Sequence, residues 1–196
     1  YYLLASKDGI TIGKRYFKHE NNKEDYPFSP SGHNLYDNNS KLYYCRDFDN
    51  IVYQIHEDSV VPRFRINLPN PLPASMIEER PNEMSLLRSG YSLGITDIYE
   101  YGGLLFFRFV KDGYIWSCLY NVEESKQVYC AKRIKFLDSS LIDTIDGIYK
   151  DCFYSILTPE YLDYAFSENP LEDYPDLFKT YDVEGDNPVI AFYRAV

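Results

Sequence analysis

Short apolar and aromatic runs alternate with turn signals along the chain. The runs fall at residues 1–5 and 10–17, at 42–45, 50–55 and 60–67, and at 95–99, 104–110, 114–120 and 127–136. Glycine-containing turns at 7–9, 102–103 and 111–113 separate several of them, and glycine readily adopts the positive φ that tight hairpins need. The pattern predicts an all-β chain of antiparallel hairpins. The last four runs are expected to form one four-stranded sheet.

Two segments break this pattern. Residues 73–89 place apolar side chains among charges and predict a short helix or an ordered excursion. Residues 159–181 are acidic and contain prolines, with apolar residues at helical spacing within 161–166 and a second possible helix at 171–181. The run 187–193 then predicts a terminal strand, with Pro188 near its start, where no ladder donor is needed.

Two of the strand sets look like one unit used twice. Runs 42–45 and 104–107 are each followed by an acidic turn, an aromatic strand and a strand flanked by basic residues, as in 62–68 and 131–137. Repeated four-stranded units are typical of β-propeller blades. We therefore expect a single β-propeller segment over 1–196: first blades at 1–68, an inter-blade excursion at 69–94, a central blade at 95–137, and a last blade at 138–196 with a helical insertion at 159–181.

Four segments resemble a family of six-bladed β-propellers from exported, often lipoprotein-like, Bacteroidetes proteins of unknown function. They are 48–55 (FDNIVYQI), 61–67 (VPRFRIN), 142–147 (IDTIDG) and 185–194 (GDNPVIAFYR). Their order is that of the family's C-terminal half, although Ile148 stands where the family often has a second glycine. The resemblance implies a periplasmic or cell-surface location, with the signal and lipid anchor outside this sequence, and implies no established activity.

The number of strands has a consequence for the surface. The runs supply about three blades, whereas six blades of four strands need about twice as many. The apolar faces of the first and last blades then have no neighbour within this sequence, and strand 187–193 lacks an outer partner. We expect the isolated chain to self-associate, since monomers seldom expose large apolar patches.

Charge and apolar run lengths limit the partners. The net charge of −10 disfavours nucleic acid as a partner. The longest apolar run, 102–110, contains Arg108 and is far below the roughly 20 residues that span a bilayer, so no membrane span is expected. The expected partner is a protein or a glycan, bound without catalysis, and no cofactor is expected.

Side chains with catalytic potential are few. His19, His33 and His56 lie in turn-like contexts and read as solvated loop residues, and no nucleophile elbow or phosphate loop is present. The candidate ligand-binding residues are Asp97, Tyr99, Asp143 and Asp146, which could converge near the propeller channel. The alternative function is therefore a metal-dependent hydrolase or lyase in that channel. Otherwise these carboxylates cap turns by accepting backbone N–H groups, and no metal is expected.

Cysteine and aromatic residues are read mainly as structural. Cys45, Cys118, Cys130 and Cys152 are expected to be small buried hydrophobes without a zinc site. The alternative for one pair is a disulfide, because Cys118 and Cys130 flank the turn 121–126 and could face each other across a hairpin. Trp116 is expected to be buried between blades. Exposed tyrosines near strand ends, with Tyr91, Tyr99, Tyr101 and Tyr114 as candidates, could form a binding platform.

Overall fold

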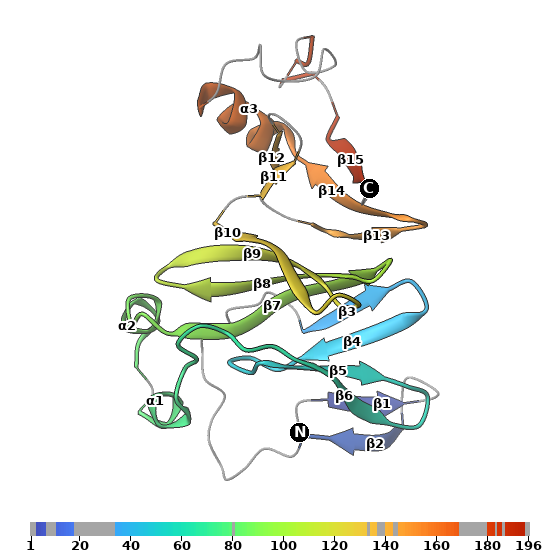
Figure 1. Cartoon of the computed structure of the whole chain (residues 1–196), viewed down its shortest axis with the longest axis vertical. Coiled ribbons are helices and arrows are strands. Elements are labelled where there is room, and N and C mark those ends of the chain that lie inside the picture. Colours follow the sequence, from blue (N-terminus) through green and yellow to red (C-terminus); the bar gives the residue numbers. More distant parts are fainter. Residues whose placement is uncertain are drawn as a thin grey trace. The chain divides into compact units, whose positions relative to one another are not determined.

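The computed structural model describes residues 3–6, 11–17, 34–79, 81–132, 134–136, 140–142, 145–168, 180–182, 184–185 and 187–194 (Figure 1). Four predictions lie wholly or mostly outside these residues: the turn at 7–9, the histidines at 19 and 33, Asp143, and the helix at 171–181. The chain divides into two compact units. Unit 1 is Tyr1–Leu35, Lys41–Thr96 and Val110–Gly113, and unit 2 is Tyr36–Ser40, Asp97–Phe109 and Tyr114–Val196.

The chain is mostly β, which confirms the expected fold class. Strands β1 (Leu3–Ser6) and β2 (Ile12–Tyr16) form an antiparallel hairpin. A four-stranded sheet follows, in the order β3 (Leu35–Asn38), β4 (Lys41–Cys45), β5 (Ile51–Ile55) and β6 (Val60–Arg65). The sequence predicted the last three strands of this sheet and missed β3.

A second four-stranded sheet has the same sequential order, from β7 (Ser92–Tyr101) through β8 (Leu104–Lys111) and β9 (Tyr114–Asn121) to β10 (Lys126–Ala131). This sheet was predicted, but the expected strand at 127–136 was wrong in extent. It breaks after Ala131, and β11 (Ile134–Phe136) pairs with β12 (Ser140–Ile142) instead. The last sheet has the order β13 (Gly147–Tyr149), β14 (Cys152–Leu157) and β15 (Val189–Tyr193).

Within the described part of the chain, three short helices accompany the sheets. Helices α1 (Ala74–Glu78) and α2 (Glu83–Leu87) confirm the excursion predicted at 73–89. The Asn82 side chain caps α2 by accepting the Ser85 N–H at 2.9 Å. Helix α3 (Pro159–Glu168) confirms the first helix of the acidic segment. Among the residues that the structure describes, no helix is long and apolar enough to cross a membrane.

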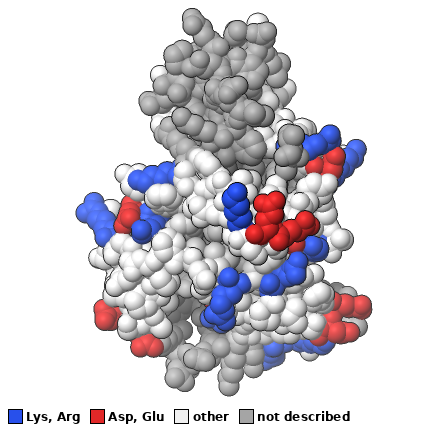
Figure 2. Space-filling model, viewed as in Figure 1, with Lys and Arg blue, Asp and Glu red and all other residues white. Residues whose placement is uncertain are grey.

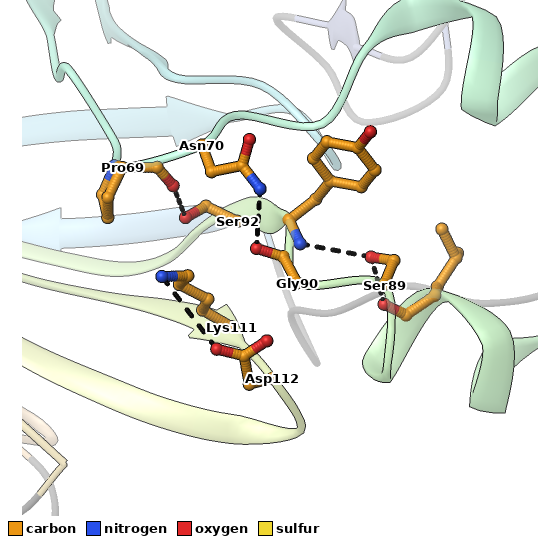
Figure 3. Close-up of polar contacts among 9 residues, drawn as sticks. Pro69, Asn70, Ser89, Gly90, Ser92, Lys111 and Asp112 are labelled. Carbon is orange, nitrogen blue, oxygen red and sulfur yellow. Dashed lines mark hydrogen bonds and ion pairs between the residues drawn. The ribbon is translucent and has the colours of Figure 1, made fainter.

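In unit 1, the segment after β6 is fixed to the start of β7. The Ser92 hydroxyl donates to the Pro69 carbonyl, and the Asn70 amide donates to the Gly90 carbonyl at 2.9 Å (Figure 3). Beneath this corner lies a buried apolar cluster of Leu86, Leu93 and Val110. The polar contacts satisfy backbone carbonyls at the edge of a buried cluster, where an unpaired group is costly.

The acidic loop after β4 also docks on β7 within unit 1. The Asp49 carboxylate accepts the Asn50 N–H at 2.7 Å, and its backbone carbonyl accepts the Ile95 N–H at 3.2 Å. Gly94 has φ +100°, and a Cβ built there would lie 2.9 Å from both the Cα and the backbone N of Phe48. The loop is a turn, as predicted, and only glycine fits opposite it.

In unit 2, a buried amide joins β3 to β7. Asn38 is 3% exposed; its Nδ2 donates to the Ile98 carbonyl at 3.2 Å and its Oδ1 accepts the Glu100 N–H at 2.6 Å. A buried amide that loses such partners would carry a large desolvation cost. Asn38 therefore specifies how these two strands meet.

Two predictions about β9 and β10 are corrected. Cys118 and Cys130 are directly opposite in the β9–β10 ladder and form a disulfide, so for this pair the favoured interpretation as buried thiols is wrong. Cys45 and Cys152 are not disulfide-bonded, and of these two only Cys45 is buried. Trp116 was expected to be buried but is half-buried, with its ring stacked on Phe109 at 6.3 Å between centroids. It lies near the exposed start of β9, where Tyr114 and Ile115 face solvent.

Candidate functional site

The predicted ligand-binding residues on β7 lie in the interior of unit 2. Asp97 is 6% exposed and Tyr99 is 5% exposed. The Asp97 carboxylate accepts a hydrogen bond from the Arg108 guanidinium at 2.7 Å, which pairs the charge where it is shielded from water. Burial, with the nearby Asp97 and Asp146 charges, raises the pKa of Tyr99 above its ordinary value. The ring is therefore a neutral packing residue near pH 7.

Asp146 is held by three backbone contacts. Its carbonyl accepts the Tyr99 hydroxyl at 3.0 Å, and its N–H donates to the Tyr154 carbonyl at 2.8 Å. Its carboxylate accepts the Ile156 N–H at 2.7 Å, which continues the β13–β14 ladder beyond the first residue of β13. The carboxylate thus binds a backbone N–H across the strand ladder and not within a turn.

The structure thus brings Asp97, Tyr99 and Asp146 into one part of unit 2, with their polar atoms engaged by the protein. Within the described ranges, no group of three or more His, Cys, Asp or Glu residues could hold a metal ion. Asp143 lies outside these ranges. His56 is exposed in the turn between β5 and β6, as expected for a solvated loop residue.

The most unusual surface in unit 2 is one side of the β13–β14–β15 sheet. The register pairs Tyr149 with Cys152, Tyr154 with Phe192, and Ile156 with Ile190, and directly opposed residues share a face. These six side chains, with Gly147, define what we call the outer face. Each of these seven residues is apolar, aromatic or a thiol, and at one end of the face the Arg194 side chain hydrogen-bonds Cys152.

The outer face is exposed. The exposed fractions are 54% for Tyr149, 46% for Ile156, 55% for Ile190 and 54% for Phe192. Scattered single apolar residues are normal on a protein surface, but here four large ones lie on three adjacent strands. Four large apolar side chains are thus exposed together on one side of this sheet.

The aromatic rings of the outer face contact one another. Phe192 lies 6.0 Å from Tyr149 and 6.4 Å from Tyr154 between ring centroids, so the three rings form a row across the sheet. Gly147 makes room for this row, because a Cβ there would lie 2.7 Å from the Cε1 and the Oη atoms of Tyr154. The glycine of the 142–147 motif thus allows the Tyr154 ring to lie over β13.

The opposite side of the same sheet is a normal core surface. Phe153, Ser155 and Leu157 are buried, and Phe153 packs edge-to-face with Tyr101 of β7 at 6.4 Å. Burial raises the pKa of Tyr193 to about 12. The sheet therefore has one side that packs within unit 2 and one side that faces solvent.

Charged side chains lie at one end of the outer face. The Arg194 guanidinium binds the Asp151 carboxylate at 2.7 Å, and both side chains are more than half exposed. The Lys150 ammonium lies over the Tyr149 ring, 5.2 Å from its centroid. On the side of the molecule seen in Figure 2, basic and acidic side chains are interspersed with uncharged surface.

The sequence analysis did not name the residues of the outer face. It did predict a terminal strand at 187–193 and an uncovered face on the last sheet, and the exposures of Ile190 and Phe192 agree with this. The signal was the nearly unbroken apolar run 189–193, since a strand with one solvated side normally alternates with polar residues. Tyr114, one of the tyrosines considered as a platform, is 54% exposed, but the Lys132 ammonium lies over its ring at 3.4 Å.

Comparison with known proteins gives a likeness in fold. No protein-family model matches the chain, and no curated protein matches it. It is similar in structure to a Bacteroides fragilis protein described as a "putative exported protein", with a TM-score of 0.65 and 15% sequence identity. The match covers 84% of this chain and 50% of that protein, so the chain spans about half the length of the structure it resembles.

Proposed function

We propose that the chain is a non-enzymatic binding or scaffold protein of the cell envelope that docks a protein partner on its outer face. The observation that carries this proposal is the row of Tyr149, Tyr154 and Phe192 beside the exposed Ile156 and Ile190. Aromatic residues at the centre of an apolar patch contribute most of the binding energy in protein interfaces.

The composition of the outer face favours a protein over a glycan. Glycan sites combine aromatic rings with several polar groups that orient sugar hydroxyls. Here Ile156 and Ile190 lie beside the rings, and the only hydroxyls belong to Tyr149 and Tyr154. A second apolar surface suits this face better. The metal-dependent hydrolase or lyase remains the alternative, and no described side chain favours it.

Two observations support an envelope location. The structural neighbour is described as an exported protein, and the fold is shared with it. Independently, Cys118 and Cys130 form a disulfide, a bond that persists in oxidising compartments and is rare in the cytosol. Both observations concern location alone; that the sheets of this chain act as blades of a six-bladed, lipoprotein-like propeller remains part of the proposal and rests on the sequence resemblance.

Site-specific photo-cross-linking tests the docking role. A photoreactive phenylalanine analogue replaces Tyr149 in the cells that produce the protein, and Tyr164 on α3, which is 48% exposed, is the matched control position. We expect protein cross-links at position 149 that disappear when Ile190→Lys is added. Equal cross-linking at 149 and 164, or cross-links that survive Ile190→Lys, would refute the proposal.

A further inference from the structure

A second surface in unit 2 brings aromatic rings and a basic side chain together. Tyr114 and Trp116 are two residues apart on β9, so their rings lie on the same face of that strand. Tyr114 is exposed, while Trp116 is half-buried and stacks on Phe109. Lys132 follows the end of β10, and its ammonium lies 3.4 Å from the centroid of the Tyr114 ring and 5.8 Å from that of the Trp116 ring. We call Tyr114, Trp116 and Lys132 the aromatic–lysine site.

The Cys118–Cys130 disulfide holds the two strands together beside this site. Cys118 lies two residues after Trp116 in β9. Cys130 lies two residues before Lys132 and directly opposite Cys118 in the ladder. A covalent link so close keeps the end of β10 against β9 and limits the positions open to the Lys132 side chain. A ligand therefore meets the ammonium and the rings already side by side, which lowers the entropy cost of binding.

Two hydrogen-bond donors at the site lack an acceptor on the protein. The indole N–H of Trp116 is buried and has no hydrogen-bond partner among the described residues. The Lys132 ammonium contacts the rings, and none of the ion pairs between described side chains includes it. An unpaired buried donor costs about 1–3 kcal/mol. A ligand that brings oxygen acceptors to both groups therefore gains more here than on an ordinary surface.

The rings and donors together match a sugar that carries a carboxylate. The C–H face of a pyranose packs on an aromatic ring such as Tyr114, and the sugar hydroxyls accept hydrogen bonds from N–H donors. A carboxylate on the same sugar accepts charge-assisted hydrogen bonds from Lys132, which a neutral sugar cannot do as strongly. Because the net charge of −10 disfavours anions over the rest of the chain, this ammonium is needed for such a ligand to bind.

We propose that the aromatic–lysine site binds a uronic acid residue of an acidic glycan, with the sugar ring on Tyr114 and the sugar carboxylate on Lys132. The flexible Lys132 side chain moves from the ring face to the carboxylate, and a sugar hydroxyl accepts the Trp116 indole N–H. The site lies on a different sheet from the outer face, so it does not depend on the docking role proposed for that face.

Trp116 is the only tryptophan of the chain, so its fluorescence reports directly on this site. A trimer of galacturonic acid is titrated into the purified chain, and the methyl ester of this trimer, with the same rings and no carboxylate charge, is the matched ligand. We expect the trimer to change the emission saturably with a Kd on the order of 1 mM, and the methyl ester to bind about tenfold more weakly. A hexaglutamate peptide, which has carboxylates and no sugar ring, should leave the emission unchanged.

Three variants separate the site from general effects of charge. Lys132→Met and Tyr114→Ala change exposed side chains, so both should melt as the wild type does, and each should weaken trimer binding about tenfold. Lys126→Met removes the same charge at the other end of β10 and should bind the trimer as the wild type does. The inference would be overturned by the absence of a saturable change with the trimer, by equal binding of the methyl ester or of hexaglutamate, or by equal losses in Lys132→Met and Lys126→Met.

Discussion

A Gly94→Ala substitution tests whether β7 lies directly against the loop after β4. Gly94 has φ +100°, and a Cβ there would lie 2.9 Å from the Phe48 Cα and backbone N and 3.0 Å from the Asp49 N. Gly102 has φ +58° and nothing within 4 Å of its Cβ position. The variants Gly94→Ala and Gly102→Ala therefore share the positive-φ cost, and only the first adds a steric clash with backbone.

The two costs can be estimated separately. An alanine in the left-handed region costs about 1–2 kcal/mol, partly offset by about 0.4–1 kcal/mol from the stiffer unfolded chain. Overpacking against a backbone that must shift adds about 1–3 kcal/mol. We expect Gly102→Ala to cost about 1 kcal/mol and Gly94→Ala about 2 to 4 kcal/mol, and the larger loss corresponds to a melting temperature about 10 °C lower than in the wild type.

Urea unfolding followed by far-UV circular dichroism measures both variants, and a second probe, Trp116 fluorescence, checks that unfolding is two-state. Equal losses in the two variants would mean that the loop 46–50 does not lie against Gly94. A variant that changes only the dependence of the unfolding free energy on urea concentration, with the same midpoint, would also refute the reasoning. Such a change would mean that the substitution acts on the unfolded chain.

Three further predictions concern the interior of unit 2. Arg108→Met leaves the buried Asp97 carboxylate unpaired, so urea titration should show a loss of about 3 kcal/mol in the free energy of unfolding. Arg194→Met breaks an exposed ion pair and should leave the unfolding midpoint nearly unchanged. Equal effects would contradict the burial of the first pair. Replacing both Cys118 and Cys130 with Ala should lower the free energy of unfolding by about 3 kcal/mol, because the disulfide closes a loop in the unfolded chain. If more than two thiols react in the denatured, unreduced wild type, the disulfide is absent. Burial raises the pKa of Tyr99 in the folded chain above the ordinary tyrosine pKa of about 10. Folding therefore favours the neutral hydroxyl, and this contribution to the free energy of unfolding is full below about pH 10 and is lost as the pH rises above it. In urea titrations, the free energy of unfolding should fall less between about pH 9 and pH 11 in Tyr99→Phe than in the wild type. An equal fall in both proteins would mean that a group other than Tyr99 causes the alkaline loss of stability.

Local patterns were enough to predict most strands, and contacts distant in sequence explain the misses. Residues 51–55 and 104–110 are nearly continuous apolar runs bounded by turn signals, a pattern that favours strands. Strand β3 was missed because two of its four residues, Asp37 and Asn38, are polar. Asn38 is buried only because the distant Ile98 and Glu100 supply its partners.

The same limit applies to the candidate site. The sequence placed Asp97 within a predicted strand and Asp146 just before another, but their partners, Arg108 and the Ile156 N–H, depend on strand register. The Cys118–Cys130 bond depends on a register that shifts between Gln127 and Tyr129. An uncovered face on the last sheet could be predicted from the apolar strand 189–193, but the residues that form it required the pairing of three strands.

The most direct test of the docking role is the accessibility of the outer face in the cells that produce the protein. A cysteine replaces Ile156, at the centre of this face, in a Cys152→Ser background, and a cysteine at Tyr164 serves as the control. The rate of maleimide labelling is measured in intact cells and in the dilute purified chain. We predict that position 156 reacts much more slowly in cells than in the dilute purified chain, while position 164 reacts at similar rates in both. Similar rates at position 156 in cells and in dilute solution would contradict the claim that a partner covers the outer face.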